Sequence, residues 1–200
     1  MYMGDVKSKT FLDTNASSAT FVAAAARPTT TFTLAKTSFG TNTARKITAT
    51  TAGTSDNGKT ITIVGKDHNN EDATEVITLT GSAETSSGTT TAFLTITSAT
   101  VSAQPSDNVS LGMTADVFGS IFQGRTRVRQ VNAESGGSIG SVLFRNGSLT
   151  GTALLTVRTG ATAGDVNTVN IPQDGILYKD GAFVTFDETQ CNSATVYFDG

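Results

Sequence analysis

The sequence predicts an all-β protein built from two β-sandwich-type domains in series, preceded by an extended N-terminal arm. Between residues 45 and 112, short runs alternate apolar with hydroxyl-bearing side chains, so that one row points inward and the next outward. Clusters of Gly, Asn, Asp and Ser separate these runs, as turns between strands do. Threonine, a β-branched residue that suits strands, is more frequent than any other residue.

Composition narrows the class of protein. Two hundred residues allow one large or two small domains. Charged residues make up only 16% and the net charge is −3, which argues against a nucleic-acid partner. No apolar run of about 20 residues predicts a membrane span. The opening residues lack the apolar segment of a secretory signal. Cys191 is the only cysteine and excludes an intrachain disulfide, so we expect assembly in a reducing cytoplasm.

Residues 1–30 form the expected arm. The stretch 21–28 is the only part of the arm with helix-like composition, and Pro28 disfavours helix at Arg27. Two interpretations remain open here: an arm with little structure of its own, and an arm that docks on a neighbouring subunit.

Residues 31–116 form the first expected domain. We expect it to be Ig-like, because it contains seven short predicted strands. The expected strands are 31–35, 45–50, 60–64, 75–80, 92–97, 99–103 and 108–112. Their expected inward residues are Ile47, Ile61, Ile63, Ile77, Leu79, Leu94, Ile96, Val101, Val109 and Leu111. The pair Asn57-Gly58 tolerates positive φ and predicts a tight hairpin.

Residues 117–200 form the second expected domain. Its expected strands are 117–122, 125–132, 138–145, 153–158, 165–171, 176–179, 182–186 and 194–198. Pairs of turn residues at 136–137, 146–147 and 180–181 separate several of them. Pro172 falls at a strand end, where its missing N–H matters least.

Two groups of motifs resemble modules of tailed-bacteriophage virion proteins. Residues 30–112 contain Ala44-Arg45-Lys46-Ile47-Thr48, Gly58-Lys59-Thr60-Ile61-Thr62-Ile63-Val64-Gly65-Lys66-Asp67, Glu75-Val76-Ile77-Thr78-Leu79 and Phe93-Leu94-Thr95-Ile96-Thr97-Ser98-Ala99-Thr100-Val101. This order resembles the module pattern AR-x-V/I-T, G-x-T-I/F-T-I/V-x-G-x-D, E-x-I/V-T-L and F-x-x-I/V-T-S-A/V/I-x-V. The end of the chain, from Pro172-Gln173-Asp174-Gly175-Ile176 through Gly181-Ala182-Phe183-Val184 to Ala194-Thr195-Val196-Tyr197-Phe198, resembles a second small phage domain. The turn at 67–70 departs from the first pattern, because it lacks the usual Gly.

The resemblance implies a virion structural protein. Within that class we expect a capsid decoration, or cement, protein that binds the major capsid protein non-covalently and associates with itself as a dimer or trimer. A domain of about 85 residues buries only about 60% of its unfolded surface, so neighbours that cover more of it add stability. Low charge and many hydroxyls suit a broad, wet interface. The alternatives are a neck, tail or fibre protein, and a carbohydrate- or cell-surface-binding module.

No residue pattern predicts an enzyme, a cofactor or a metal site. His68, the only histidine, falls in a polar loop, where we expect it to be solvated. Four residues with side-chain oxygens could bind calcium, but they lack EF-hand spacing and its central Gly and so predict a plain polar turn: Asp67, Asn69, Glu71 and Asp72. Cys191 has no basic neighbour in sequence and predicts a structural thiol. Asp187 and Glu188 are adjacent, so on a strand they face opposite sides and cannot act as a hydrolase pair.

Two clusters are candidate protein-interface residues. Arg125, Arg127 and Arg129 alternate on an expected strand, so that their guanidinium groups share one face. That face is either a guarded solvent face or a clamp for carboxylates of a partner subunit. Tyr197 and Phe198 are neighbours on the last strand, so we expect one to face inward and the other to meet a neighbouring subunit.

Overall fold

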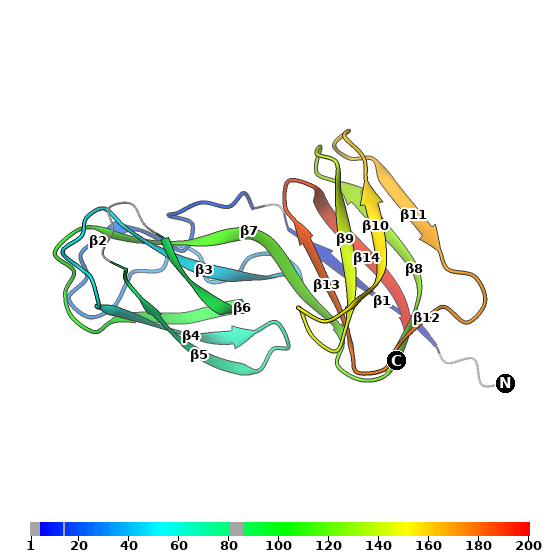
Figure 1. The fold of residues 1–200 in the computed structure, drawn as a ribbon, viewed down its shortest axis with the longest axis horizontal. Helices are drawn as coiled ribbons and strands as arrows, with labels where there is room; N and C mark the ends of the chain where they lie inside the picture. The colour runs from blue at the N-terminus through cyan, green and yellow to red at the C-terminus, as the bar shows by residue number, and fades with distance from the viewer. Residues whose placement is uncertain (1–4, 14, 81–85) are drawn as a thin grey trace. The chain divides into compact units, whose positions relative to one another are not determined.

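The protein is all-β, as the sequence predicts. A computed structural model describes residues 5–13, 15–80 and 86–200, and these residues form strands and no α-helix (Figure 1). None of the described chain therefore provides a helix long and apolar enough to cross a membrane. The strands are β1 (Val6–Leu12), β2 (Ala23–Ala26), β3 (Ala44–Thr51), β4 (Thr60–Asp67), β5 (Asp72–Thr78), β6 (Ser86–Val101), β7 (Val109–Phe122), β8 (Thr126–Ser135), β9 (Gly140–Asn146), β10 (Ala153–Thr159), β11 (Val166–Asn170), β12 (Ile176–Tyr178), β13 (Ala182–Asp187) and β14 (Cys191–Asp199).

The chain divides into two compact units. The middle unit contains Ser17–Phe39 and Ala44–Thr114. The C-terminal unit contains Met1–Ala16, Gly40–Thr43 and Ala115–Gly200. The chain passes from one unit to the other inside β7, close to the domain boundary expected after residue 116, but residues from the start of the chain join the C-terminal strands.

One long strand organises the middle unit. Its strand order is β7–β3–β6–β4–β5, with β2 beside β7. The first part of β6 pairs with β3, from Thr50 opposite Ser86 to Arg45 opposite Phe93, and the second part pairs with β4. The strands expected at 92–97 and 99–103 are therefore one strand, which links β3 to β4 in the strand order.

A β-bulge changes which residues of β6 face the core. Eight of the ten expected inward residues are buried, whereas Leu94 and Val101 are only half-buried. The β4–β6 register shifts between Val64 and Gly65 and again after Lys66, so that Phe93 and Ile96 both point inward. Gly65 lies at this bulge, where a Cβ atom would overlap the backbone oxygen of Thr95. Strict period two was therefore the wrong rule for Leu94.

Two sheets enclose the core of the C-terminal unit. One has the order β10–β9–β13–β7, and the other has the order β1–β14–β8–β11 with β12 beside β8 (Figure 1). Both contribute apolar side chains to a single cluster, in which Phe144, Val184, Val131 and Val196 are fully buried.

The beginning of the chain differs most from expectation. Residues 6–12, expected to be part of an arm, form β1, which pairs with β14 over seven positions from Val6 opposite Asp199 to Leu12 opposite Ser193. The alanine run, expected to be at most a helical turn, forms the short strand β2 beside β7. Residues 31–35 contribute only an isolated bridge from Thr31 to Thr100 rather than a strand. Tertiary pairing outweighed local composition at β1 and β2, whereas residues 31–35 have strand-like composition but find no continuous partner.

Phe11 anchors β1 in the core. Its side chain is fully buried, and it occupies the space beside Gly119 of β7, where a Cβ atom would overlap its ring. The Lys9 ammonium lies 5.7 Å from the centre of the same ring and donates a hydrogen bond of 2.7 Å to the carbonyl of Ser120. The match between a phenyl ring and a glycine fixes where β1 sits.

We expect Phe11→Ala to lower the free energy of unfolding by about 3–5 kcal/mol, because it leaves a cavity in a closed core. Gly119→Ala should destabilise the natural chain through overlap with Phe11 and should cost less in the Phe11→Ala background. Chemical denaturation of the two single variants and the double variant measures this coupling. Leu12→Ala, whose side chain is 37% exposed, is the control. Strictly additive effects of the two substitutions would show that the ring and the glycine do not share this space.

A buried carboxylate fixes the turn between β3 and β4. Asp56 is fully buried and accepts hydrogen bonds from Lys59 Nζ at 2.7 Å, from the amide of Ser106 at 2.7 Å and from the amide of Asp107 at 3.0 Å. Burial alone would raise the pKa of Asp56, but these hydrogen bonds outweigh it and hold the pKa below its usual value. The ionised group therefore ties the turn to the segment before β7.

Asp56→Asn should lower stability at neutral pH by about 1–3 kcal/mol, since buried donors lose a charged acceptor. A carboxyl whose pKa is lower in the folded state stabilises the fold above its unfolded pKa of about 3.9 and loses that contribution as the pH falls through the folded value. The variant's stability should therefore change less than that of the natural chain between about pH 5 and pH 2. Asp72→Asn, whose side chain is 94% exposed, is the control. Parallel pH profiles for Asp56→Asn and the natural chain would contradict this role.

Candidate protein-interaction surface

The three predicted arginines do not share one free face. Strand β8 begins at Thr126, so Arg125 precedes it and is exposed. Arg127 and Arg129 lie on β8 and are half-buried. The described structure therefore separates one solvent-facing arginine from two that are engaged within the chain.

Arg129 is held by the last strand. Its Nη2 and Nε atoms lie 2.6 Å and 2.8 Å from Oδ2 of Asp199, and its Nη1 donates to the carbonyl of Gln173 at 3.0 Å. The hydrogen bond with Asp199 raises the pKa of Arg129 above its ordinary value. A register shift between Tyr197 and Phe198 makes Arg129 the extra residue of a bulge, next to Gln130 on the outer side of the sheet.

Arg127 and Arg129 together hold the loop between β11 and β12. Arg127 Nη1 lies 3.2 Å from the carbonyl oxygen of Asp174 and 3.5 Å from that of Gly175. The loop contains one residue in an unfavourable backbone conformation, because Gln173 has a positive φ of 58° without being glycine, and the bond from Arg129 to its carbonyl helps to hold it there. The expectation of three guanidinium groups available to a partner therefore changes: two of them bind this chain's own carbonyls and its own Asp199.

A shallow hollow of about 300 Å³ opens beside these arginines. Arg125, Thr126, Arg127, Leu177, Asp199 and Gly200 line it. The Thr126 hydroxyl donates to the carbonyl of Asp199, which ties the start of β8 to the end of β14. The sequence did not identify Asp199 or this loop as partners of the arginines, because no local pattern indicates contacts between residues that are far apart in the chain.

Tyr197 and Phe198 face opposite sides of β14, as their adjacency predicts. Phe198 is 5% exposed and packs in the core, where its ring centre lies 6.1 Å from that of Phe122. Tyr197 is half-buried on the outer side, opposite Gln130 of β8 and Ser8 of β1. Tyr197 is thus the member of the pair that is left accessible.

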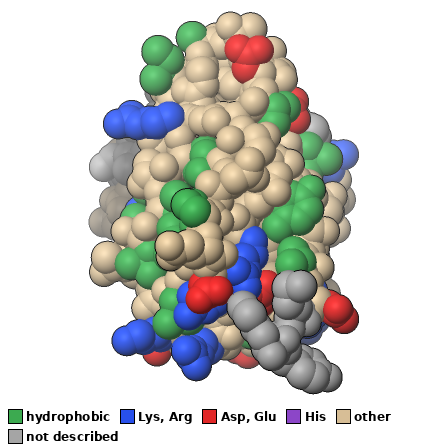
Figure 2. Space-filling model, turned by 90° about the vertical axis from the view of Figure 1, so that its right-hand side faces the viewer, with side chains coloured by type: hydrophobic (Ala, Val, Ile, Leu, Met, Phe, Trp, Pro, Cys, Tyr) green, Lys and Arg blue, Asp and Glu red, His purple; other side chains and the backbone are tan. Residues whose placement is uncertain are grey.

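The outer side of the β1–β14–β8–β11 sheet, which we call the polar face, carries rows of uncharged polar side chains. The register aligns two such rows, Ser8–Tyr197–Gln130–Asn170 and Thr10–Thr195–Asn132–Thr168. Some of these groups bond one another: the hydroxyl oxygens of Thr10 and Thr195 are 2.9 Å apart, and Gln130 Nε2 donates to Asn132 Oδ1 at 3.1 Å. Figure 2 shows a face of the molecule on which backbone and uncharged polar side chains, both tan, cover most of the surface, with basic and acidic side chains next to each other in its lower part.

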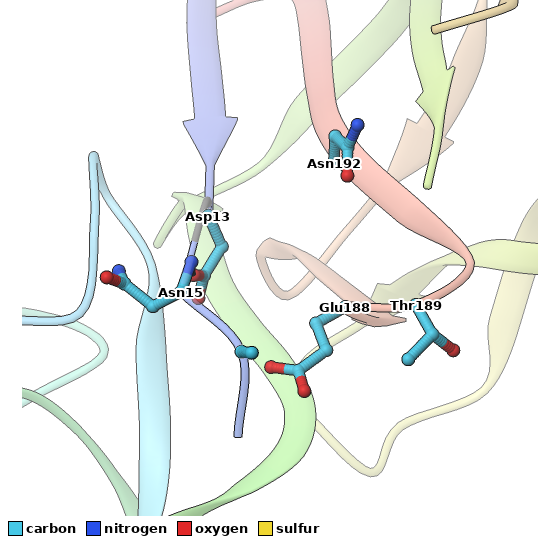
Figure 3. A pocket seen from close by; sticks show the side chains of 6 residues that line it. Asp13, Asn15, Glu188, Thr189 and Asn192 are labelled. Atoms are coloured by element: carbon cyan, nitrogen blue, oxygen red, sulfur yellow. Dashed lines mark hydrogen bonds between the residues drawn. The ribbon is translucent and has the colours of Figure 1, made fainter. Parts of the chain in front are cut away.

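A second, polar hollow of about 220 Å³ lies at the opposite end of β14 (Figure 3). Asp13, Asn15, Ala16, Glu188, Thr189 and Asn192 line it. The Glu188 side chain points toward the segment that carries Asp13 and Asn15, whereas the neighbouring Asp187 accepts hydrogen bonds from the amide and hydroxyl of Thr189. Among the described residues, no three His, Cys, Asp or Glu side chains are grouped as metal ligands would be.

The turn after β4 uses its polar residues for its own backbone. Asp67 Oδ1 accepts from the amides of Asn69 and Glu71, and Asn70 takes the positive φ of 66° that the usual Gly would supply. His68 is not fully solvated, since its side chain is only 18% exposed. Burial lowers the pKa of His68, although Asp67 and Glu71 oppose this effect.

Cys191 is buried at the start of β14, as a structural thiol would be. Its Sγ atom donates to the carbonyl of Ser193 at 3.1 Å. Burial raises the pKa of this thiol to about 12, so that the thiol stays protonated near neutral pH.

Comparison of the chain with family models, with curated proteins and with solved structures found no match. The resemblance to virion proteins, and the roles of Arg125, Arg127, Arg129, Tyr197 and Phe198 at an interface, therefore stay predictions.

We expect Arg129→Ala to release the loop at 171–175, because that substitution removes both the bond to Gln173 and the pairing with Asp199. Amide hydrogen exchange at Gly175 and Ile176 should become about tenfold faster. Asp199→Asn, which keeps the Arg129 guanidinium in place, should have a smaller effect. Arg125→Ala is the matched control, and equal exchange in Arg125→Ala and Arg129→Ala would refute the assignment of the loop to Arg129.

Proposed function

We propose that this chain is a bacteriophage capsid decoration, or cement, protein. It binds the outside of the major capsid protein lattice non-covalently, associates with itself as a dimer or trimer, and is assembled in the host cytoplasm as part of the virion. In this proposal the middle unit is an Ig-like domain, and both units are β-sandwich-type domains.

The observation that carries the proposal is the polar face of the C-terminal unit. Its rows of hydroxyl, amide and phenol groups offer many directional hydrogen bonds over a broad sheet surface, which suits a wet protein–protein interface. The motif resemblance in residues 30–112 and 171–198 supports the same class of protein.

Tyr197 on the polar face and Arg125 beside it are the proposed contact residues. Tyr197 is half-buried, so that little side-chain entropy is lost when a partner covers it. Arg125 is exposed beside the hollow next to β8 and can reach a carboxylate of a partner. Arg127 and Arg129 act indirectly, because they hold the neighbouring loop in place. Phe198 packs in the core and so fixes β14, the strand that carries Tyr197.

The alternatives concern where the same surface works. A neck, tail or fibre protein would use it on a few neighbours, and a carbohydrate- or cell-surface-binding module would direct the same hydroxyl and amide groups toward sugar hydroxyls. The number of copies of this chain per major capsid protein in purified particles separates capsid decoration from a place in the neck or tail. Hundreds of copies support decoration, whereas about six or twelve support the neck or tail.

Binding of purified variants to particles that lack this protein tests the contact residues. Tyr197→Ser and Arg125→Ala should each weaken binding about tenfold without unfolding the protein. Phe198→Ser should instead unfold the C-terminal unit, because its ring is in the core. Arg158→Ala, an exposed arginine on β10, is the charge-matched control. Equal binding by Tyr197→Ser, Arg125→Ala and Arg158→Ala would reject the polar face as the contact, while binding by none of the proteins, the natural chain included, would reject decoration itself.

A further inference from the structure

The chain contains two Asn-Gly pairs, Asn57-Gly58 and Asn146-Gly147. In such a pair the missing Cβ of glycine lets its backbone nitrogen approach the preceding asparagine side chain. The two pairs are chemically identical in sequence, so any difference in their reactivity must come from the fold.

The fold immobilises Asn146. Its Nδ2 donates to Asp180 Oδ2 at 3.0 Å, and its Oδ1 accepts from the amides of Lys179 and Asp180 at 2.8 Å and 3.3 Å. The amide of the following Gly147 donates to the carbonyl of Gly181 at 3.0 Å. The side-chain carbonyl carbon of Asn146 is therefore held in one orientation by three bonds.

Asn57 is exposed, and the described structure gives its side chain no hydrogen-bond partner. Gly58 has a φ of 81°, and nothing lies within 4 Å of the position that a Cβ would occupy there. Lys59 donates from its amide to the carbonyl of Asp56 at 3.0 Å, which makes Asn57 and Gly58 the central residues of a turn. The Gly58 amide donates to the carbonyl of Leu79 at 3.0 Å, as the Gly147 amide does to its own partner, so the two pairs differ chiefly in the asparagine side chain.

We propose that Asn57 is a site of spontaneous deamidation in the folded protein, and that Asn146 is protected. The Gly58 nitrogen loses its proton to solvent base and attacks Cγ of Asn57. A Gly58 N–Asn57 Cγ bond forms, the Cγ–Nδ2 bond breaks and ammonia leaves, taking up a proton. Water then opens the resulting succinimide at either carbonyl and gives aspartate or isoaspartate at position 57.

The product changes a sensitive turn. Asp56 is fully buried, and its carboxylate binds Lys59 and the amides of Ser106 and Asp107. Deamidation adds a negative charge at the next residue, and the isoaspartate form also adds one atom to the turn's backbone. Both changes act on the segment that positions Asp56, so the modified protein should unfold at a lower denaturant concentration.

The test uses the full chain, incubated in its folded state in mildly alkaline buffer and then digested and mapped by mass spectrometry. Asn57 should deamidate at least about tenfold faster than Asn146, which corresponds to about 1.4 kcal/mol in barrier height. The same incubation in urea should bring the two rates together, since both pairs are then unrestrained. Similar slow rates in the folded chain, or faster reaction at Asn146, would overturn the proposal.

Two variants keep the proposal falsifiable. Asn57→Gln retains an amide but would have to form a larger ring, so it should stop the reaction at position 57 without altering Asn146. Asn57→Asp supplies the charged product directly and should lower the denaturation midpoint relative to Asn57→Gln. One result would show that the turn itself protects Asn57: Asn57 stays unmodified in the folded natural chain, although Asn146 reacts when the chain is unfolded in urea. The assignment of Asn57 would then fail.

Discussion

The pairing of β1 with β14 is the constraint on which the C-terminal unit depends. It brings Phe11 from the start of the chain into a core that is otherwise built from residues after 115. The hydroxyl pair of Thr10 and Thr195 joins positions 185 residues apart. Closing a loop of that length costs conformational entropy, which the buried ring, the seven-residue register and the hydrogen bonds of Lys9 and Thr10 offset.

This constraint explains which parts of the fold were predictable. Strands such as β4 and β13 stand out in the sequence because their period-two pattern is local. The strand β1 does not, since its sequence has one deeply buried residue, Phe11, and is recognised only by its partner. Similarly, the alanines of β2 carry no strand signal and adopt that conformation because β7 offers a free edge. The misplacement of Leu94 has another cause, because a bulge resets the alternation in β6, and its mark in the sequence is Gly65 on the partner strand β4.

The candidate surface shows the same division between local and distant information. Alternation alone placed Tyr197 and Phe198 on opposite faces of one strand. It could not show that Arg129 contacts two groups that are distant in sequence. These are the carboxylate of Asp199, 70 residues further along the chain, and the carbonyl of Gln173, 44 residues further along. Nor could it show that Arg125 stands outside β8. Arginines that the sequence suggests are available to a partner thus bind groups of the same chain, and only the tertiary fold determines where those groups lie.

The internal bonds of these arginines affect how the polar face would bind a partner. With Arg127 and Arg129 satisfied by carbonyl groups and by Asp199, the rows that remain are hydroxyl, amide and phenol groups. Such groups exchange hydrogen bonds with water for hydrogen bonds with a partner, so each contact adds little net free energy and depends little on salt. A single copy that binds in this way would dissociate readily. Two or three linked copies, each meeting its own site on a regular lattice, would raise the overall affinity by the effective concentration of the second site without requiring a stronger contact. Under the proposed function, self-association is therefore what turns a weak polar face into a stable attachment, and the surface chemistry and the oligomer have to be explained together.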